Sequence, residues 1–193
     1  MDTGDVPTGG RRYGPWDISD VPGWSNEFGR LDLGSLIVSP AIGTQVRLEA
    51  ADDQLIAATF VLDGSQIQLQ AFASTVANLW DDVRREIKDG LRQWENREAV
   101  EAMGSLGPEL IVPPAGDGKG AEKGDEALSF VGSDGPGWLL RGVFSGPAVA
   151  PGPIRDKFER LFRSTIVVRG DQALPERAPL PLRPPLDAQN QRR

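Results

Sequence analysis

The chain of 193 residues contains no cysteine and no histidine. The absence of cysteine excludes disulfide bonds, a thiolate nucleophile and metal sites with cysteine ligands. The absence of histidine excludes a Ser-His-Asp triad, an HExxH zinc site and an imidazole general base. The remaining chemistry is acid–base work by carboxylates, lysine or tyrosine chemistry, binding of hard metal ions by oxygen, and binding without catalysis.

Long apolar runs and excess positive charge are also missing. No apolar run approaches the ~20 residues of a membrane-spanning helix, and residues 1–12 contain no apolar segment of the signal-peptide type. The chain carries 28 acidic and 21 basic side chains, which gives a formal charge of -7. Nucleic-acid binding needs lysine and arginine to neutralise phosphates, so general binding of this kind is not expected. We predict an acidic, cytoplasmic protein without a membrane contact.

Glycine and proline are abundant instead, with 23 and 16 residues, and their distribution divides the chain into three parts. Residues 1–12 are small and polar, which predicts a disordered N-terminus. Residues 13–173 are predicted to form a single domain that begins with an extended strap at 13–29. Residues 174–193 are rich in proline, which favours polyproline II and predicts a tail outside the folded core.

Both flanking segments leave alternatives open. The strap carries four aromatic residues among glycine and proline, namely Tyr13, Trp16, Trp24 and Phe28. Their rings either fill pockets on the domain or form an exposed recognition segment. The tail has PxxP spacing from Pro181 to Pro184. Such a segment docks in the aromatic groove of a partner, lies across its own domain, or stays disordered.

The best hairpin signal lies in the first half of the domain. Residues 55–62 form a nearly continuous apolar run, which predicts a strand buried on both faces. Asp63-Gly64 supplies a turn, and the apolar residues from Ile67 to Ala71 then alternate with Gln66, Gln68 and Gln70. The three glutamines share one face of their strand, which is either solvated or lines a binding surface. Further strands are expected at 31–38, 46–48, 109–112, 128–131, 138–144 and 165–168.

Residues 76–94 give the clearest helical pattern. Apolar residues recur there at spacings of three and four, at Val76, Trp80, Val83, Ile87, Leu91 and Trp94. Ser74 or Thr75 can cap its start, and Trp80 and Trp94 are expected in the core. A second amphipathic helix is expected after Pro153. Because few βαβ units occur, the predicted fold class is α+β, an antiparallel sheet with two amphipathic helices packed on one face.

No motif in the sequence specifies a cofactor, a metal site or catalytic residues. Residues 116–120 resemble a phosphate-binding loop, but glycine follows the lysine and no helix follows the loop. Ser145 precedes a glycine without forming a GxSxG motif. Asp82 and Glu86 lie four residues apart on one helix face, and with Asp81 they are the best candidates for a Mg²⁺-dependent carboxylate site.

Six segments of the chain are distinctive as a set. They are GPWD (14–17), GRLDLGSL (29–36), IQLQAFA (67–73), LWDDVRREI (79–87), FVGSDGPGWLLRGVFSGPA (130–148) and IVVRGD (166–171). Together they resemble an uncharacterised actinobacterial family, domain of unknown function 3710, over residues 13–186. The resemblance implies an actinobacterial cytoplasmic protein. The family has no established activity or catalytic residues, so no functional site carries over from it.

The leading functional hypothesis is a non-enzymatic protein-interaction or adaptor module, with a protein partner and no cofactor or metal. Its predicted binding surface is the Gln66, Gln68 and Gln70 face together with Arg141, while Trp138 and Phe144 are expected in the core. One alternative is the small carboxylate-based enzyme. Another is a nucleic-acid-associated regulator that acts through three arginine pairs, namely Arg11/Arg12, Arg84/Arg85 and Arg192/Arg193. The sequence leaves the identity of the partner open, and also whether copies of the chain associate.

Overall fold

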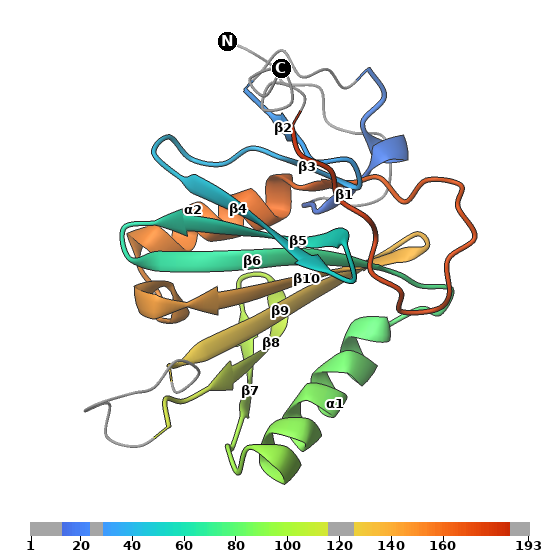
Figure 1. The fold of residues 1–193 in the computed structure, drawn as a ribbon. Coiled ribbons are helices and arrows are strands. Elements are labelled where there is room, and N and C mark those ends of the chain that lie inside the picture. The colour runs from blue at the N-terminus through green and yellow to red at the C-terminus, as the bar shows by residue number, and fades with distance from the viewer. Residues whose placement is uncertain (1–12, 24–28, 116–125, 186–193) are drawn as a thin grey trace.

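The main layer of the fold is a seven-stranded antiparallel sheet with the strand order β4-β5-β6-β10-β9-β8-β7, shown in Figure 1. This computed structural model describes residues 13–23, 29–115 and 126–185. The strands are β4 (Gln45–Ala51), β5 (Gln54–Leu62), β6 (Ser65–Ala73), β7 (Val100–Gly104), β8 (Gly107–Val112), β9 (Leu128–Gly135) and β10 (Trp138–Ser145). Since β6 pairs with β10, the three glutamines lie beside a strand that is distant in the sequence.

Two tight turns connect neighbouring strands of the large sheet. The turn between β5 and β6 consists of Asp63 and Gly64, and both have positive φ angles of 49° and 71°. This is the left-handed conformation that two-residue hairpin loops require. Pro136 and Gly137 connect β9 to β10, and the positive φ of Gly137 (79°) suits a turn that begins with proline. The predicted hairpin is therefore confirmed.

The strand β9 continues through Gly135, four residues beyond its expected end at 131. Two glycines in this extension lie under indole rings. A Cβ atom at Gly132 would come within 2.2 Å of the Trp80 ring, and one at Gly135 within 2.1 Å of the Trp138 ring. These glycines therefore allow close packing within a strand rather than a turn.

A second, smaller sheet has the order β1-β11-β3-β2. Its strands are β1 (Trp16–Asp17), β2 (Leu31–Asp32), β3 (Leu36–Val38) and β11 (Ile166–Val167). Trp16 N donates a hydrogen bond to Thr165 O at 2.9 Å, and the buried Asp17 accepts one from Trp138 Nε1 at 2.7 Å. This part of the strap is thus docked on the domain. Tyr13 is exposed, while Trp24 and Phe28 lie outside the described residues, as do residues 1–12 with Arg11/Arg12 and 186–193 with Arg192/Arg193.

The helices α1 (Leu79–Trp94) and α2 (Pro153–Ser164) confirm the α+β class. They lie on opposite faces of the seven-stranded sheet, so the prediction that both pack on one face is wrong. On β10, the buried Leu140 packs with α2, whereas Leu139 packs with α1. Neighbouring residues of a strand point to opposite faces. The periodicity of a helix shows which side of it is buried, but not which face of a sheet it covers. Among the described residues, neither helix is long and apolar enough to cross a membrane.

The helix α1 differs from its prediction at both ends. It begins at Leu79 and leaves Val76 exposed, and neither Ser74 nor Thr75 caps it. The carboxylate of Asp134 accepts from the Trp80 backbone N–H instead. At the other end Trp94 is 80% exposed, so its predicted place in the core is wrong. Trp80 is buried as predicted, and its Nε1 donates to Pro108 O at 2.8 Å.

The largest core cluster lies between the sheet and α2. It includes Trp138 and Phe144, which are fully buried as predicted, and Phe158 and Phe162 from α2. Pro153 stands at the first turn of α2, where the helix needs no backbone donor. Thus β10 supplies the core on one face and the predicted binding residue Arg141 on the other.

The tail enters this core, so its predicted place outside is wrong for two leucines. Leu180 is fully buried and Leu182 nearly so. The β5–β6 pairing extends only from Ala58↔Leu69 to the turn, and the tail fills the gap beyond. Leu180 N donates to Ala71 O at 2.8 Å, and Leu182 N donates to Leu55 O at 2.7 Å. In the alternation Pro-Leu-Pro-Leu, the leucines stand at the positions whose backbone N–H donates a hydrogen bond to the domain. The prolines, which have no N–H, stand at the positions between them.

Candidate functional site

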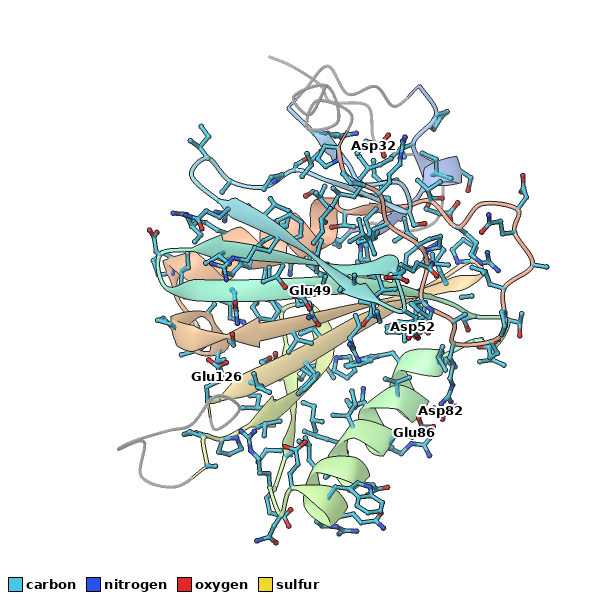
Figure 2. All side chains as sticks on the ribbon, viewed as in Figure 1. Asp32, Glu49, Asp52, Asp82, Glu86 and Glu126 are labelled. Carbon is cyan, nitrogen blue, oxygen red and sulfur yellow. The ribbon has the colours of Figure 1, made fainter. Side chains whose placement is uncertain are left out.

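One face of the seven-stranded sheet is only partly covered. There α1 packs against Phe72, Phe130 and Leu139, and beside it lies a hollow of about 540 Å³ that no residue of α1 lines. We call this hollow the open face. Its lining includes Arg47, Glu49, Thr59, Gln66, Gln68, Leu128, Val143 and Ser145. Glu126 also borders it, and Figure 2 labels this residue together with Glu49. The open face therefore combines both charges, neutral donors and acceptors, and apolar surface.

The edge strand β4 is fixed to the hairpin by a shared carboxylate. Glu49 accepts a hydrogen bond from Gln68 Nε2 at 2.7 Å and a second one from Thr59 Oγ1. Gln66 lies two residues before Gln68 on β6 and on the same face of the strand. It is half-buried and makes no side-chain hydrogen bond within the described part of the chain. Its amide carries two donor hydrogens and an acceptor oxygen that a ligand can use.

The structure brings the four predicted binding residues to one face. Gln66 and Gln68 line the open face, while Gln70 is buried and lies directly opposite Arg141 on β10. The Arg141 Nη2 donates to Gln70 Oε1 at 2.8 Å, and its guanidinium lies 5.2 Å from the centre of the Phe72 ring. Gln70 is thus not solvated but serves as a neutral partner for a half-buried cation.

Arg141 is unusual in its electrostatics. Burial removes water from its guanidinium and lowers its pKa. The Nε atom is buried and has no hydrogen-bond partner. None of the ion pairs among the described residues includes Arg141. The half-buried guanidinium thus contacts a neutral amide and an aromatic ring instead of a carboxylate.

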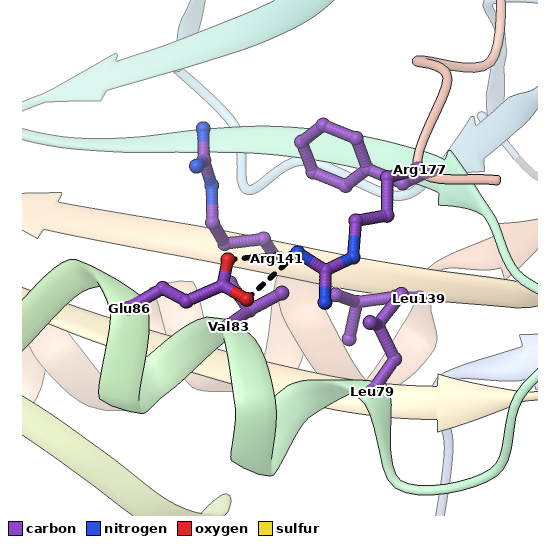
Figure 3. A pocket seen from close by; sticks show the side chains of 7 residues that line it. Leu79, Val83, Glu86, Leu139, Arg141 and Arg177 are labelled. Atoms are coloured by element: carbon purple, nitrogen blue, oxygen red, sulfur yellow. Dashed lines mark hydrogen bonds and ion pairs between the residues drawn. The ribbon is translucent and has the colours of Figure 1, made fainter.

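A smaller pocket of about 140 Å³ lies between α1 and the sheet. We call it the α1 pocket, and it is lined by Phe72, Leu79, Val83, Leu139, Arg141 and the ion pair of Glu86 and Arg177. In that pair Arg177 Nη1 donates to both carboxylate oxygens at 2.8 Å, which raises the pKa of Arg177. Figure 3 shows the Arg141 guanidinium directed away from this pair.

Comparison with known proteins identifies the family. Residues 14–191 match the model of a family described as "Protein of unknown function (DUF3710)". The chain belongs to this family. No curated protein and no solved structure matched the chain. The resemblance seen in the sequence is therefore confirmed at the level of the family.

The carboxylates proposed for a metal site do not converge in this DUF3710 chain. Asp81 pairs with Arg84 at 3.1 Å, and Asp82 pairs with Arg85. Glu86 is the carboxylate already paired at the α1 pocket. Within the ranges that the structure describes, no group of three or more acidic side chains could hold a metal ion. The phosphate-loop-like segment at 116–120 lies outside the described residues, and Ser145 is a buried residue at the end of β10.

Sequence reasoning missed the largest buried ion network of the DUF3710 fold. Arg155 on α2 donates to Glu159 Oε1 at 2.9 Å and also to Glu109 on β8. Ser129 and Ser105 donate to these carboxylates. The only local signal is the spacing of four between Arg155 and Glu159, which is common on solvated helices. The network lies on the face opposite the open face, so it positions α2 rather than a ligand.

Proposed function

We propose that this DUF3710 protein is a non-enzymatic protein-interaction module, an adaptor that binds an extended segment of a protein partner on the open face. The observation that carries the proposal is the composition of that face. Its lining combines charges of both signs and the amide of Gln66 with the apolar side chains of Leu128 and Val143. An extended peptide presents backbone donors and acceptors together with apolar side chains, so it matches such a lining.

The rigidity of the scaffold supports a binding role. The open face is built on paired strands rather than loops, since β5, β6 and β10 are neighbours in one antiparallel sheet. Glu49 is held by Thr59 and Gln68, so its carboxylate is already positioned. A preorganised surface loses less conformational entropy when a partner binds. The actinobacterial and cytoplasmic setting implied by the family resemblance is part of this proposal.

A matched pair of variants tests the proposal. Tagged full-length protein is used for a native pull-down from a nuclease-treated extract of the source cells, and co-purified proteins are read by mass spectrometry. Gln66→Arg places a bulky charge in the open face, whereas Gln93→Arg makes the same change at an exposed position of α1. We expect a stoichiometric partner with the wild-type chain and with Gln93→Arg, and its loss with Gln66→Arg.

Two outcomes would contradict the proposal. One is the recovery of no stoichiometric partner with any of the three proteins. The other is a partner retained equally by Gln66→Arg and the wild-type chain, since the contact would then lie elsewhere on the molecule. Recovery of a second copy of the chain, lost with Gln66→Arg, would assign the open face to self-association instead.

A further inference from the structure

Several arginines among the described residues are buried or half-buried, including Arg84, Arg97, Arg141 and Arg155, and their partners set Arg141 apart. Arg155 is paired with two carboxylates. Arg84 has Asp81 at 3.1 Å and Glu101 at 3.8 Å, and Arg97 has Glu95 at 3.9 Å. Arg141 belongs to none of these ion pairs, and Gln70 is its hydrogen-bond acceptor. The fold thus supplies carboxylates to its structural arginines and leaves Arg141 without one.

The position of Arg141 connects two hollows. Leu139, Arg141 and Val143 follow one another on the same face of β10, because alternate residues of a strand share a face. Leu139 lines the α1 pocket and Val143 lines the open face. The guanidinium therefore stands at the border between an apolar pocket and the surface where we place the partner.

We propose that Arg141 and the α1 pocket form a binding site for a small carboxylate that carries an apolar group. The carboxylate would accept hydrogen bonds from the Arg141 Nη hydrogens that Gln70 leaves unused. The apolar group would lie against Leu79, Val83 and Leu139. The site deepens the proposed function if the carboxylate is a C-terminal or side-chain group of the partner.

The size and charge of the site select this ligand class. The α1 pocket measures about 140 Å³, and an apolar cavity of about 150 Å³ accommodates a benzene molecule. A short aliphatic or aromatic group therefore fits, but a long chain does not. Among the described residues that line the α1 pocket, Arg141 is the one cation without a carboxylate partner, because Glu86 neutralises Arg177. One net positive charge suits a carboxylate monoanion better than a doubly charged phosphate.

The test uses hexanoate as the probe on full-length protein, followed by two-dimensional NMR. Hexanamide has the same apolar chain without the charge, and inorganic phosphate has charge without the chain. We expect saturable binding of hexanoate with an affinity on the order of millimolar, and binding of hexanamide weaker by about tenfold or more. The shifted signals should include the backbone amides of Leu139, Arg141 and Val83.

Variants separate binding by Arg141 from a general charge effect. Arg141→Gln removes the cation at the site, and Arg85→Gln removes one from the exposed side of α1. We expect Arg141→Gln to weaken hexanoate binding by about tenfold or more, Arg141→Lys to weaken it less, and Arg85→Gln to leave it unchanged. Because Arg141 is half-buried and belongs to none of the ion pairs of the described residues, Arg141→Gln should still fold, and thermal unfolding checks this.

The results distinguish this inference from the proposed function. Absence of saturable hexanoate binding, equal affinity for hexanamide, or equal binding to Arg141→Gln would overturn the inference, whatever the pull-down shows. Hexanoate binding that depends on Arg141 supports it even when no protein partner is recovered. If hexanoate displaces a recovered partner, the natural carboxylate belongs to that partner; if it does not, the natural ligand is a free carboxylic acid.

Discussion

At the scale of single residues, two side chains tie the strap to the core. Asp17 accepts the indole N–H of Trp138 within the domain, and it also accepts from Ser19 N at 3.0 Å in the short 3₁₀ turn η1 (Ile18–Asp20). A buried tryptophan N–H needs an acceptor, because an unpaired buried donor costs free energy. The GPWD segment therefore contributes to the fold through its aspartate.

Replacement of Asp17 tests this contact. Asp17→Ala leaves the Trp138 N–H without its acceptor, so we expect the free energy of unfolding to fall by about 1–3 kcal/mol. Asp17→Asn keeps a side-chain oxygen in the same place and should lose less than half as much. Urea unfolding followed by tryptophan fluorescence measures both variants. Equal losses for the two variants would show that the hydrogen bond to Trp138 does not carry the effect.

Two glycines give opposite predictions for the same substitution. At Gly132 an added Cβ would lie 2.2 Å from the Trp80 ring, whereas at Gly90 it would meet no atom within 4 Å apart from its chain neighbours and the backbone of its own helix. Gly132→Ala should therefore destabilise the protein by about 1–3 kcal/mol through overpacking. Gly90→Ala, on the helix α1, should stabilise it by about 0.5–1 kcal/mol.

Thermal unfolding of the two glycine variants, side by side, checks this pair of predictions. A neutral Gly132→Ala would mean that the indole of Trp80 moves aside at little cost. A destabilising Gly90→Ala would mean that α1 has a close neighbour at this position.

At the scale of secondary-structure elements, the tail lies in the gap between β5 and β6 and hydrogen-bonds to both strands. Its leucines complete the core where β5 and β6 separate, and Thr75 reaches it through hydrogen bonds to Glu176 at 2.7 Å. These hydrogen bonds lower the pKa of Glu176, because they favour the charged carboxylate. The tail is consequently part of the domain up to residue 185, the last that the structure describes in it.

We predict that Leu180→Ala lowers the free energy of unfolding by about 2–5 kcal/mol, since it leaves a cavity in a fully buried site. Val76→Ala, which shortens an exposed side chain, should change it by at most about 0.5 kcal/mol. Equilibrium unfolding in urea compares the two variants directly. A loss below about 1 kcal/mol for Leu180→Ala would place the tail outside the cooperative unit.

Most elements of this fold were predictable because their signals are local. The period of two around Gln66, Gln68 and Gln70 and the helical spacing around Trp80 depend on neighbours in the sequence. The Arg141–Gln70 pair requires the register between β6 and β10, which no local pattern contains. The alternation of proline with Leu180 and Leu182 predicts polyproline II by its composition, whereas the structure uses its period of two to bury the leucines.

At the scale of the whole molecule, the two faces of the large sheet differ in the partners that they supply to an arginine. On the α2 face, Arg155 is surrounded by Glu109, Glu159 and the carbonyl of Val149, and its guanidinium lies 4.7 Å from the centre of the Phe144 ring. On the other face, Arg141 has a neutral partner. A satisfied network fixes packing, while an unsatisfied cation remains available to a ligand. This division places structural stability on one side of the sheet and the candidate site on the other.

The Arg155 network joins α2 to β8 and β9 and should therefore control the stability of the whole domain. Arg155→Met leaves the carboxylates of Glu109 and Glu159 buried without their cation, so we expect a loss of about 3–5 kcal/mol in the free energy of unfolding. Arg160→Met, at an exposed position of the same helix, should change it by at most about 0.5 kcal/mol.

Urea unfolding followed in parallel by tryptophan fluorescence and circular dichroism measures the loss. A single shared transition, moved to lower urea in Arg155→Met alone, is expected because α2 packs into the largest core cluster. Separate transitions for the two probes would instead show that α2 unfolds apart from the sheet and that the network stabilises only the helix.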